Sequence, residues 1–172
     1  DYSPVFDDQA QPAGVIALVV ETTERVLAER ELQGQQARLQ EMFEQAPGLM
    51  AMLRGPEHVF EMANPAYLRV VGERDVIGKP VREALPEVER QGFIDILDRV
   101  YRSGTAFVGS GIRIGLQRTQ GEAEEERLLD FVFQPVTDAN GNVSGIFVEG
   151  NDVTERAEAE QALRENEQRL RF

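Results

Sequence analysis

The chain has 172 residues, a formal net charge of −13 and no cysteine. This length suits one domain of ordinary size with extensions, and the missing cysteine excludes disulfides, thiolate metal ligands, cysteine nucleophiles and iron–sulfur clusters. The acidic balance argues against nucleic acid as a partner, because phosphate binding needs a basic face. The longest apolar run, Gly14 to Val20, is too short to span a bilayer. We therefore expect a cytoplasmic segment without a membrane partner.

The start and the end of the chain repeat one another. Residues 4–41 align without a gap with residues 135–172, and the triplet Thr23-Glu24-Arg25 returns as Thr154-Glu155-Arg156. Similarity at a fixed spacing indicates a repeated structural unit. We therefore predict that the chain holds the tail of one module with its connector, followed by a complete second module with its own connector.

Each copy of the repeat begins with a predicted β-hairpin. In the first copy, Tyr2–Phe6 alternates like a strand, residues 7–12 are rich in turn formers, and Val15–Val20 has the composition of a buried strand. In the second copy, strands over Leu128–Val136 and Val143–Val148 flank an Asn-Gly turn of the kind that tight hairpins need. Because the first hairpin lacks the rest of a sheet, we expect its apolar edge to pair with another strand or chain.

Each hairpin continues into a polar helix. At the second helix, Asp152-Val153-Thr154-Glu155 has the form of a capping box, in which Asp152 accepts hydrogen bonds from first-turn amides and Glu155 reaches back. We also expect Glu155 and Arg156 to pair at the helix surface, where such a pair contributes ~0–1 kcal/mol.

Apolar residues recur along both helices at spacings of four and three, with Gln or Asn at one core position in each copy. The predicted seam comprises Ala28, Leu32, Gln35, Leu39 and Met42 in the first helix and Ala159, Leu163, Asn166 and Leu170 in the second. This pattern predicts a two-stranded parallel coiled coil and therefore a parallel homodimer. The alternative is that each is an amphipathic helix lying on its own domain.

Between the two helices the sequence predicts two strands, several short helices and three further strands. Asn64 is placed to cap the first short helix, with Pro65 in the first position, where a missing N–H costs nothing. The main predicted segments are strands at Gly48–Leu53, His58–Met62 and Phe107–Leu116, a helix with an apolar stripe at Phe93–Tyr101, and an acidic loop at Gln120–Glu126. This order predicts an α+β domain, an antiparallel sheet with helices on one face.

Four motifs of this region, taken in order, resemble a PAS domain. They are Asn64-Pro65-Ala66-Tyr67, Val76-Ile77-Gly78-Lys79-Pro80, Asp138-Ala139-Asn140-Gly141 and Asp152-Val153-Thr154-Glu155-Arg156. The last is similar to the Asp-Ile-Thr signature at which PAS domains continue into an output helix. The resemblance covers about residues 42–152 and implies a PAS fold, a five-stranded antiparallel sheet with short helices on one face, flanked by helical coiled-coil linkers.

The resemblance also implies domain limits and a function. We expect the C-terminal hairpin of an upstream PAS domain at 1–21, a coiled-coil linker at 22–46, the PAS domain at 47–152 and an output helix at 153–172. The family implies a bacterial sensory or dimerisation module that acts on a histidine kinase or diguanylate cyclase domain in the same polypeptide. The sequence contains no motif of such an output, so we expect no catalysis from this chain.

The resemblance narrows the choice of cofactor. The flavin-adduct photosensors of the family need a cysteine, and the haem-binding branch needs a histidine on the long helix. The single histidine, His58, lies instead beside the turn of the first hairpin, and we expect it at the surface rather than as a metal or haem ligand. The absence of tryptophan also disfavours a noncovalent flavin. We therefore expect no cofactor and no metal, while a small organic ligand remains open.

A ligand cavity would be lined from the inner sheet face and the long helix. The candidate lining residues are Met50, Met52, Phe60, Met62, Leu85, Phe93, Ile96, Leu97, Phe131 and Phe133. Such side chains equally form an unfilled, tightly packed core. Arg113 joins the candidates because it interrupts an apolar strand. Alternation places it on the outer face, and only an inward orientation would favour an anionic ligand.

The expected mechanism is mechanical. A change in the core or sheet would shift the strand Val143–Val148 and with it the angle at which the following helix departs. Four residues are expected to transmit this change, namely Asp152, Thr154, Glu155 and Arg156. Two alternatives stay open: a passive dimerisation spacer, and a protein-docking module that offers the acidic loop Glu122–Glu126 to a basic partner.

Overall fold

A computed structural model of the chain describes residues 2–6, 12–17, 19–119 and 121–171. The chain divides into two compact units, residues 1–42 and residues 43–172. The smaller unit contains the antiparallel strands β1 (Tyr2–Phe6) and β2 (Pro12–Ala17) and most of helix α1 (Val19–Gln45).

The predicted strand over Val15–Val20 is wrong at its end. Strand β2 ends at Ala17, and Val19 and Val20 already belong to α1, because the helical penalty of valine is small enough for context to override it. Of the predicted turn at residues 7–12, Pro12 already belongs to β2, and residues 7–11 lie outside the described residues, as does Leu18.

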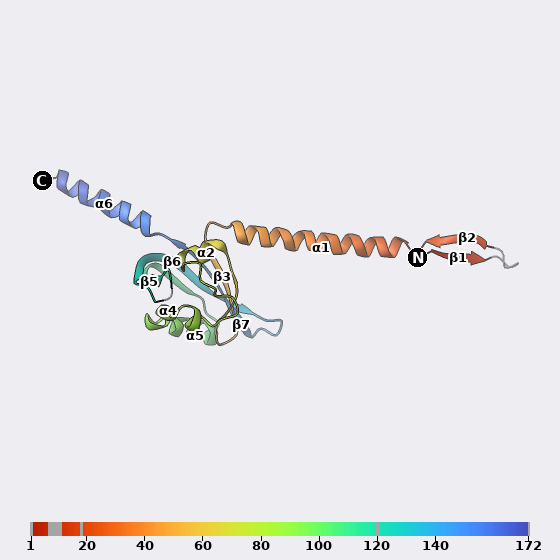
Figure 1. The fold of residues 1–172 in the computed structure, drawn as a ribbon, viewed down its shortest axis with the longest axis horizontal. Coiled ribbons are helices and arrows are strands. Elements are labelled where there is room, and N and C mark those ends of the chain that lie inside the picture. The colour runs from red at the N-terminus through yellow and green to blue at the C-terminus, as the bar shows by residue number, and fades with distance from the viewer. Residues whose placement is uncertain (1, 7–11, 18, 120, 172) are drawn as a thin grey trace. The chain divides into compact units, whose positions relative to one another are not determined.

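The larger unit is built on a five-stranded antiparallel sheet in the order β4-β3-β7-β6-β5. Its strands are β3 (Leu49–Arg54), β4 (Val59–Ala63), β5 (Phe107–Gln117), β6 (Glu124–Thr137) and β7 (Val143–Asp152). The predicted α+β fold with a five-stranded antiparallel sheet is therefore confirmed (Figure 1).

Along the chain, four short helices follow β4 and precede β5. They are α2 (Pro65–Val70), α3 (Val81–Ala84), α4 (Pro86–Arg90) and α5 (Phe93–Ser103). The longer helix α6 (Thr154–Leu170) follows β7 (Figure 1). Among the described helices, none is long and apolar enough to cross a membrane.

Asn64 organises the start of the helical segment, as its sequence context predicts. Its side-chain oxygen accepts the Tyr67 amide at 2.9 Å and the Met50 amide at 3.0 Å, and its Nδ2 donates to the Gly48 carbonyl at 2.8 Å and the Phe43 carbonyl at 3.2 Å. The side chain is fully buried, so each of these bonds replaces water that it cannot reach. One amide thus fixes helix α2 to the start of β3.

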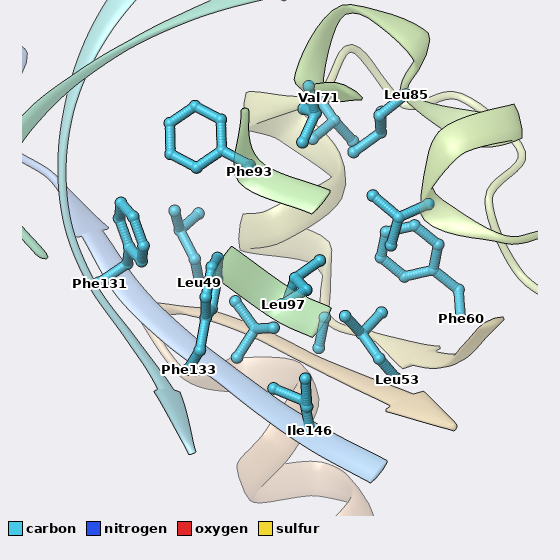
Figure 2. Packing of buried hydrophobic residues seen from close by; sticks show 14 of the residues in the cluster. Leu49, Leu53, Phe60, Val71, Leu85, Phe93, Leu97, Phe131, Phe133 and Ile146 are labelled. Atoms are coloured by element: carbon cyan, nitrogen blue, oxygen red, sulfur yellow. The ribbon is translucent and has the colours of Figure 1, made fainter. Parts of the chain in front are cut away.

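The core lies between the helices and the inner face of the sheet. Along β3, Leu49, Ala51 and Leu53 are buried and alternate with less buried neighbours, which is the period of a half-covered strand. Phe131 and Phe133 of β6 lie 4.7 Å apart between ring centroids. Figure 2 shows them with Phe93 and Leu97 of α5, Leu85 and Ile146 around the same interior.

Candidate functional site

The junction between β7 and α6 is tied to strand β6 through Leu128. The Val153 amide donates to the Leu128 carbonyl at 2.9 Å, and the Leu128 amide donates to the Thr154 hydroxyl at 2.9 Å. The first residue of α6 therefore completes the β6 ladder where β7 has ended. These two bonds couple the start of the helix to the sheet.

A second set of contacts at the junction comes from the Asp152 carboxylate. Its Oδ1 accepts the Thr154 amide at 3.0 Å and the Thr154 hydroxyl at 2.5 Å, and its Oδ2 lies 3.3 Å from Nη1 of Arg127. Arg127 also donates to Glu125 at 3.1 Å. Thr154 thus uses its hydroxyl twice, as a donor to Asp152 and as an acceptor from Leu128.

A predominantly apolar cavity of about 70 Å³ lies between the sheet and the helices. It is lined by Leu53, Tyr67, Val70, Val71, Val81, Leu85, Val88, Phe93, Leu97, Ile114, Leu116, Leu129, Phe131, Phe133 and Val148. Such a space holds more than one water by volume, but a wall this apolar offers water few partners. The interior is therefore suited to a small, uncharged group.

The family described as PAS fold matches residues 43–158, more than half of the chain. The chain belongs to the PAS family. The matched range includes the sheet, the cavity and the junction with α6.

Solved structures resemble the chain at the level of the fold. An RNA-binding light-oxygen-voltage receptor is 22 % identical with a TM-score of 0.59, over 78 % of this chain and 38 % of the receptor. The Vibrio cholerae VqmA dimer without target DNA is 21 % identical with a TM-score of 0.57, over 70 % of this chain and 52 % of VqmA. This chain therefore spans about half or less of those two proteins. The PAS domain of Bordetella pertussis BvgS is 22 % identical with a TM-score of 0.56, over 78 % of this chain and 98 % of that domain.

Five of the predicted lining residues of this PAS domain do line the cavity: Leu85, Phe93, Leu97, Phe131 and Phe133. Phe60 is 1 % exposed and belongs to the core without lining the cavity, and Ile96 packs partly buried against that core.

The predicted inward orientation of three methionines is wrong. Met50 and Met52 alternate with the buried Leu49, Ala51 and Leu53 and therefore point to the opposite face of the sheet. Met62 is the direct cross-strand partner of Met52, so it shares that face. Met50 and Met52 therefore share one face of β3, but the buried face is the other one.

Arg113 does not reach the cavity. Its side chain is 75 % exposed and its Nη1 lies 3.6 Å from Oε1 of Glu126. The alternation of β5 thus places it on the outer face, and the inward orientation that would favour an anionic ligand is not observed.

The expectation of a surface His58 is wrong. The residue is 1 % exposed, and its Nε2 lies 2.7 Å from Oδ1 of Asp98 on α5. Its ring meets Tyr101 edge to face at 6.0 Å between centroids, and within the described residues its Nδ1 has no hydrogen-bond partner. The carboxylate on α5 explains the burial, because a buried imidazole needs at least one polar partner.

The capping box is also wrong in detail. Val153, not Asp152, precedes the first helical residue as N-cap, without a side-chain capping bond. Asp152 still belongs to β7 and binds the Thr154 amide from there. Arg156 pairs with Glu160, one turn onward, at 3.1 Å rather than with Glu155, since side chains four residues apart face each other on a helix.

The predicted acidic loop is shorter than expected, because β6 already begins at Glu124. Strand residues Glu124, Glu125 and Glu126 each face an arginine: Arg90 at 2.8 Å, Arg118 at 3.3 Å and Arg113 at 3.6 Å, respectively. These carboxylates are therefore already engaged within the domain.

The predicted seam residues lie on helices and face solvent. In α1, Leu32, Leu39 and Met42 are 57 %, 67 % and 63 % exposed, and in α6 Leu163 and Leu170 are 60 % and 81 % exposed. Ala28, Gln35, Ala159 and Asn166 are exposed on the same two helices. Large apolar side chains exposed at regular helical spacing are typical of surfaces that another helix covers.

The domain also contains a buried ion pair between Glu87 and Arg74 that the sequence patterns did not reveal. Glu87 of α4 is fully buried and is bound by two nitrogens of Arg74, one of them at 3.2 Å, and by the Gln117 amide at 3.2 Å. Burial alone would raise the pKa of Glu87, but the hydrogen bonds from Arg74 and the charge of Arg74 hold that pKa below its ordinary value. Burial also raises the pKa of the neighbouring Tyr67 phenol.

Proposed function

We propose that this PAS domain is a sensory module that passes a conformational change from its interior to α6, and from α6 to an output domain of the histidine kinase or diguanylate cyclase type in the same polypeptide. One observation carries this proposal. Strand β6 lines the cavity with Leu129, Phe131 and Phe133 and, directly before them, binds the start of α6 through Leu128.

The path from cavity to helix is short. A displacement of the Phe131 ring moves the β6 backbone, and Leu128 lies three residues earlier on that strand. Leu128 shares one hydrogen bond with Val153 and one with Thr154, so its movement changes how α6 leaves the sheet. At the same junction, the guanidinium of Arg127 donates to the carboxylate of Asp152, so side chains as well as backbone groups connect β6 to the end of β7.

The ligand that fits the cavity is a small, uncharged and predominantly apolar molecule. A charged group in this space would lose its hydration without gaining a partner, at a cost of several kcal/mol in order of magnitude. No metal or cofactor is required by this proposal, and the net charge of −13 disfavours nucleic acid as the direct target.

The working unit of this proposal is a parallel homodimer in the cytoplasm. The exposed apolar residues of α1 and α6 would be covered by the same helices of a second copy, with Gln35 and Asn166 at polar seam positions. A polar residue at one core position sets register at a cost in stability, which suits helices that must shift.

Thr154 is the residue at which the proposal is tested. Thr154→Val removes the acceptor of the Leu128 amide, whereas Thr154→Ser keeps a hydroxyl at the same position. In the full-length protein, Thr154→Val is expected to fix the output activity at one level irrespective of ligand, and Thr154→Ser to respond as the wild type does. A ligand response of Thr154→Val equal to that of the wild type, or of Asp152→Ala equal to it, would contradict the proposal.

The second candidate is a passive dimerisation spacer whose core binds nothing. It is favoured by the modest volume of the cavity, and native mass spectrometry of the purified dimer distinguishes the two. Extra mass on the dimer excludes the spacer, and a bare dimer that also ignores added apolar compounds excludes the sensor. A docking role for residues 122–126 has less support, since Glu124, Glu125 and Glu126 already face arginines.

A further inference from the structure

The small hairpin β1–β2 has the same strand register as the hairpin β6–β7 that closes the PAS domain. In β1–β2 the pairs are Tyr2↔Ala17, Ser3↔Ile16, Pro4↔Val15 and Val5↔Gly14. In β6–β7 the pairs are Phe133↔Val148, Gln134↔Phe147, Pro135↔Ile146 and Val136↔Gly145. The sequence repeat aligns residue 4 with residue 135. With this offset, each pair of β1–β2 corresponds to one pair of β6–β7.

The two hairpins also share their irregularity. The register of β1–β2 shifts between Val5 and Phe6, and that of β6–β7 shifts between Val136 and Thr137. After the shift, pairing resumes at Phe6↔Pro12 and at Thr137↔Val143, again at the repeat spacing. A bulge at the same place preserves which face every residue occupies, so both hairpins are built to present the same faces.

One glycine indicates what lies beside β2. A Cβ on Gly145 would lie 2.3 Å from the carbonyl oxygen of Leu53, so β7 needs glycine there because β3 pairs alongside it. Gly14 pairs with Val5 as Gly145 pairs with Val136, so the two glycines occupy corresponding positions in the two hairpins. In the described residues, however, β1 and β2 form a sheet of two strands, without a third strand beside Gly14.

We infer that β1–β2 is the closing hairpin of a second PAS domain in the same polypeptide, with a β3-like strand of that domain beside β2 and a β5-like strand beside β1. A two-stranded hairpin alone is only marginally stable in water, and these neighbours would supply its missing partners. From Thr23 onward, the repeat position of Thr154, helix α1 then corresponds to α6, although α1 already begins at Val19. It is the output helix of the second domain and, through its C-terminal end, the input of this one. The chain is a relay between sensory domains.

The correspondence is tested by exchanging the hairpins within the full chain of residues 1–172. In a matched chimera, the sequence of residues 2–17 replaces residues 133–148, so that every register partner is kept. In a slipped chimera of almost equal composition, the sequence of residues 3–18 replaces the same residues and turns each side chain to the opposite face. The matched chimera is expected to keep a cooperative thermal transition that the slipped chimera loses. A matched chimera no more stable than the slipped one would overturn the inference.

A second measurement does not depend on the folding of a chimera. Amide hydrogen exchange of β1–β2 is compared between residues 1–172 alone and the natural full-length polypeptide. If the hairpin belongs to a second PAS domain, its amides exchange slower in the full-length protein by about tenfold or more, because their strand partners are then present. Equal exchange in the two proteins would overturn the inference.

Discussion

His58 Nε2 lies 2.7 Å from Asp98 Oδ1, joining the turn between β3 and β4 to the middle of helix α5. The imidazole is 1 % exposed, while the Asp98 side chain is 28 % exposed and its second oxygen lies 3.8 Å from Arg102. The polar contacts from His58 through Asp98 to Arg102 therefore lead from the interior of the domain to its surface. Since the described residues offer no partner to Nδ1, Asp98 provides the single hydrogen bond of the buried ring.

Removal of this carboxylate should destabilise the domain more than its exposure suggests. Asp98→Ala leaves both nitrogens of a buried imidazole without a partner, and we expect a loss of about 1–3 kcal/mol in the free energy of unfolding, measured by urea denaturation. Arg102→Ala is the control, because it removes only the exposed neighbour of Asp98 and should cost ~0–1 kcal/mol. Equal losses for the two variants would show that the contact between His58 and Asp98 contributes nothing.

The buried pair of Glu87 and Arg74 should give the domain an acid-sensitive component of stability. The folded-state pKa of Glu87 is lowered from 4.5, so its stabilisation is complete above that value and is lost as pH falls below it through the folded pKa. We expect Glu87→Gln to be less stable than wild type at neutral pH and to lose less stability on acidification. Thermal denaturation between pH 7 and pH 3, with Glu83→Gln on the exposed surface as control, checks this. Parallel curves for wild type and Glu87→Gln would contradict it.

The sequence predicted the order of elements well, for local reasons. Asn64 and Pro65 mark a helix start by their own chemistry, and the predicted five-stranded antiparallel sheet is observed. What the sequence did not reveal depends on partners far along the chain. His58 is buried because Asp98 lies forty residues onward, and a turn residue carries no local sign of that.

In the candidate site, too, local sequence signals were informative and contacts with distant residues were not predicted. Asp152 and Thr154 lie at the junction of β7 and α6, but the partners that give them their geometry, Leu128 and Arg127, lie on another strand. The orientation of Met50 was wrong for a related reason. Alternation defines two faces of a strand, and which one is buried is decided by the helices that cover the sheet.

Enlarging the cavity should lower the stability of the domain and strengthen its binding of apolar probes. Leu97 is 2 % exposed and lines it, so Leu97→Ala should cost about 2–5 kcal/mol, the lost transfer energy plus the cavity term. The larger space should then bind benzene or xenon, and a saturating probe should raise the melting temperature of Leu97→Ala more than that of wild type. Val108→Ala, at a position that is 71 % exposed, is the control. If the probe raises the melting temperature of Leu97→Ala no more than that of Val108→Ala, enlargement of the cavity adds no binding of apolar probes.

Gly145 should tolerate no side chain in this PAS domain. The methyl group of Gly145→Ala would lie 2.3 Å from the Leu53 carbonyl, and because that atom belongs to the backbone of β3, strands β3 and β7 must move apart. We expect a loss of about 1–3 kcal/mol and faster amide exchange along β3. Gly34→Ala in α1, where nothing lies within 4 Å of the added carbon, should leave the melting of the sheet unchanged and raise the helix content of α1. An unchanged melting temperature for Gly145→Ala would show that the close contact is not needed, and would remove the glycine argument for a strand beside Gly14.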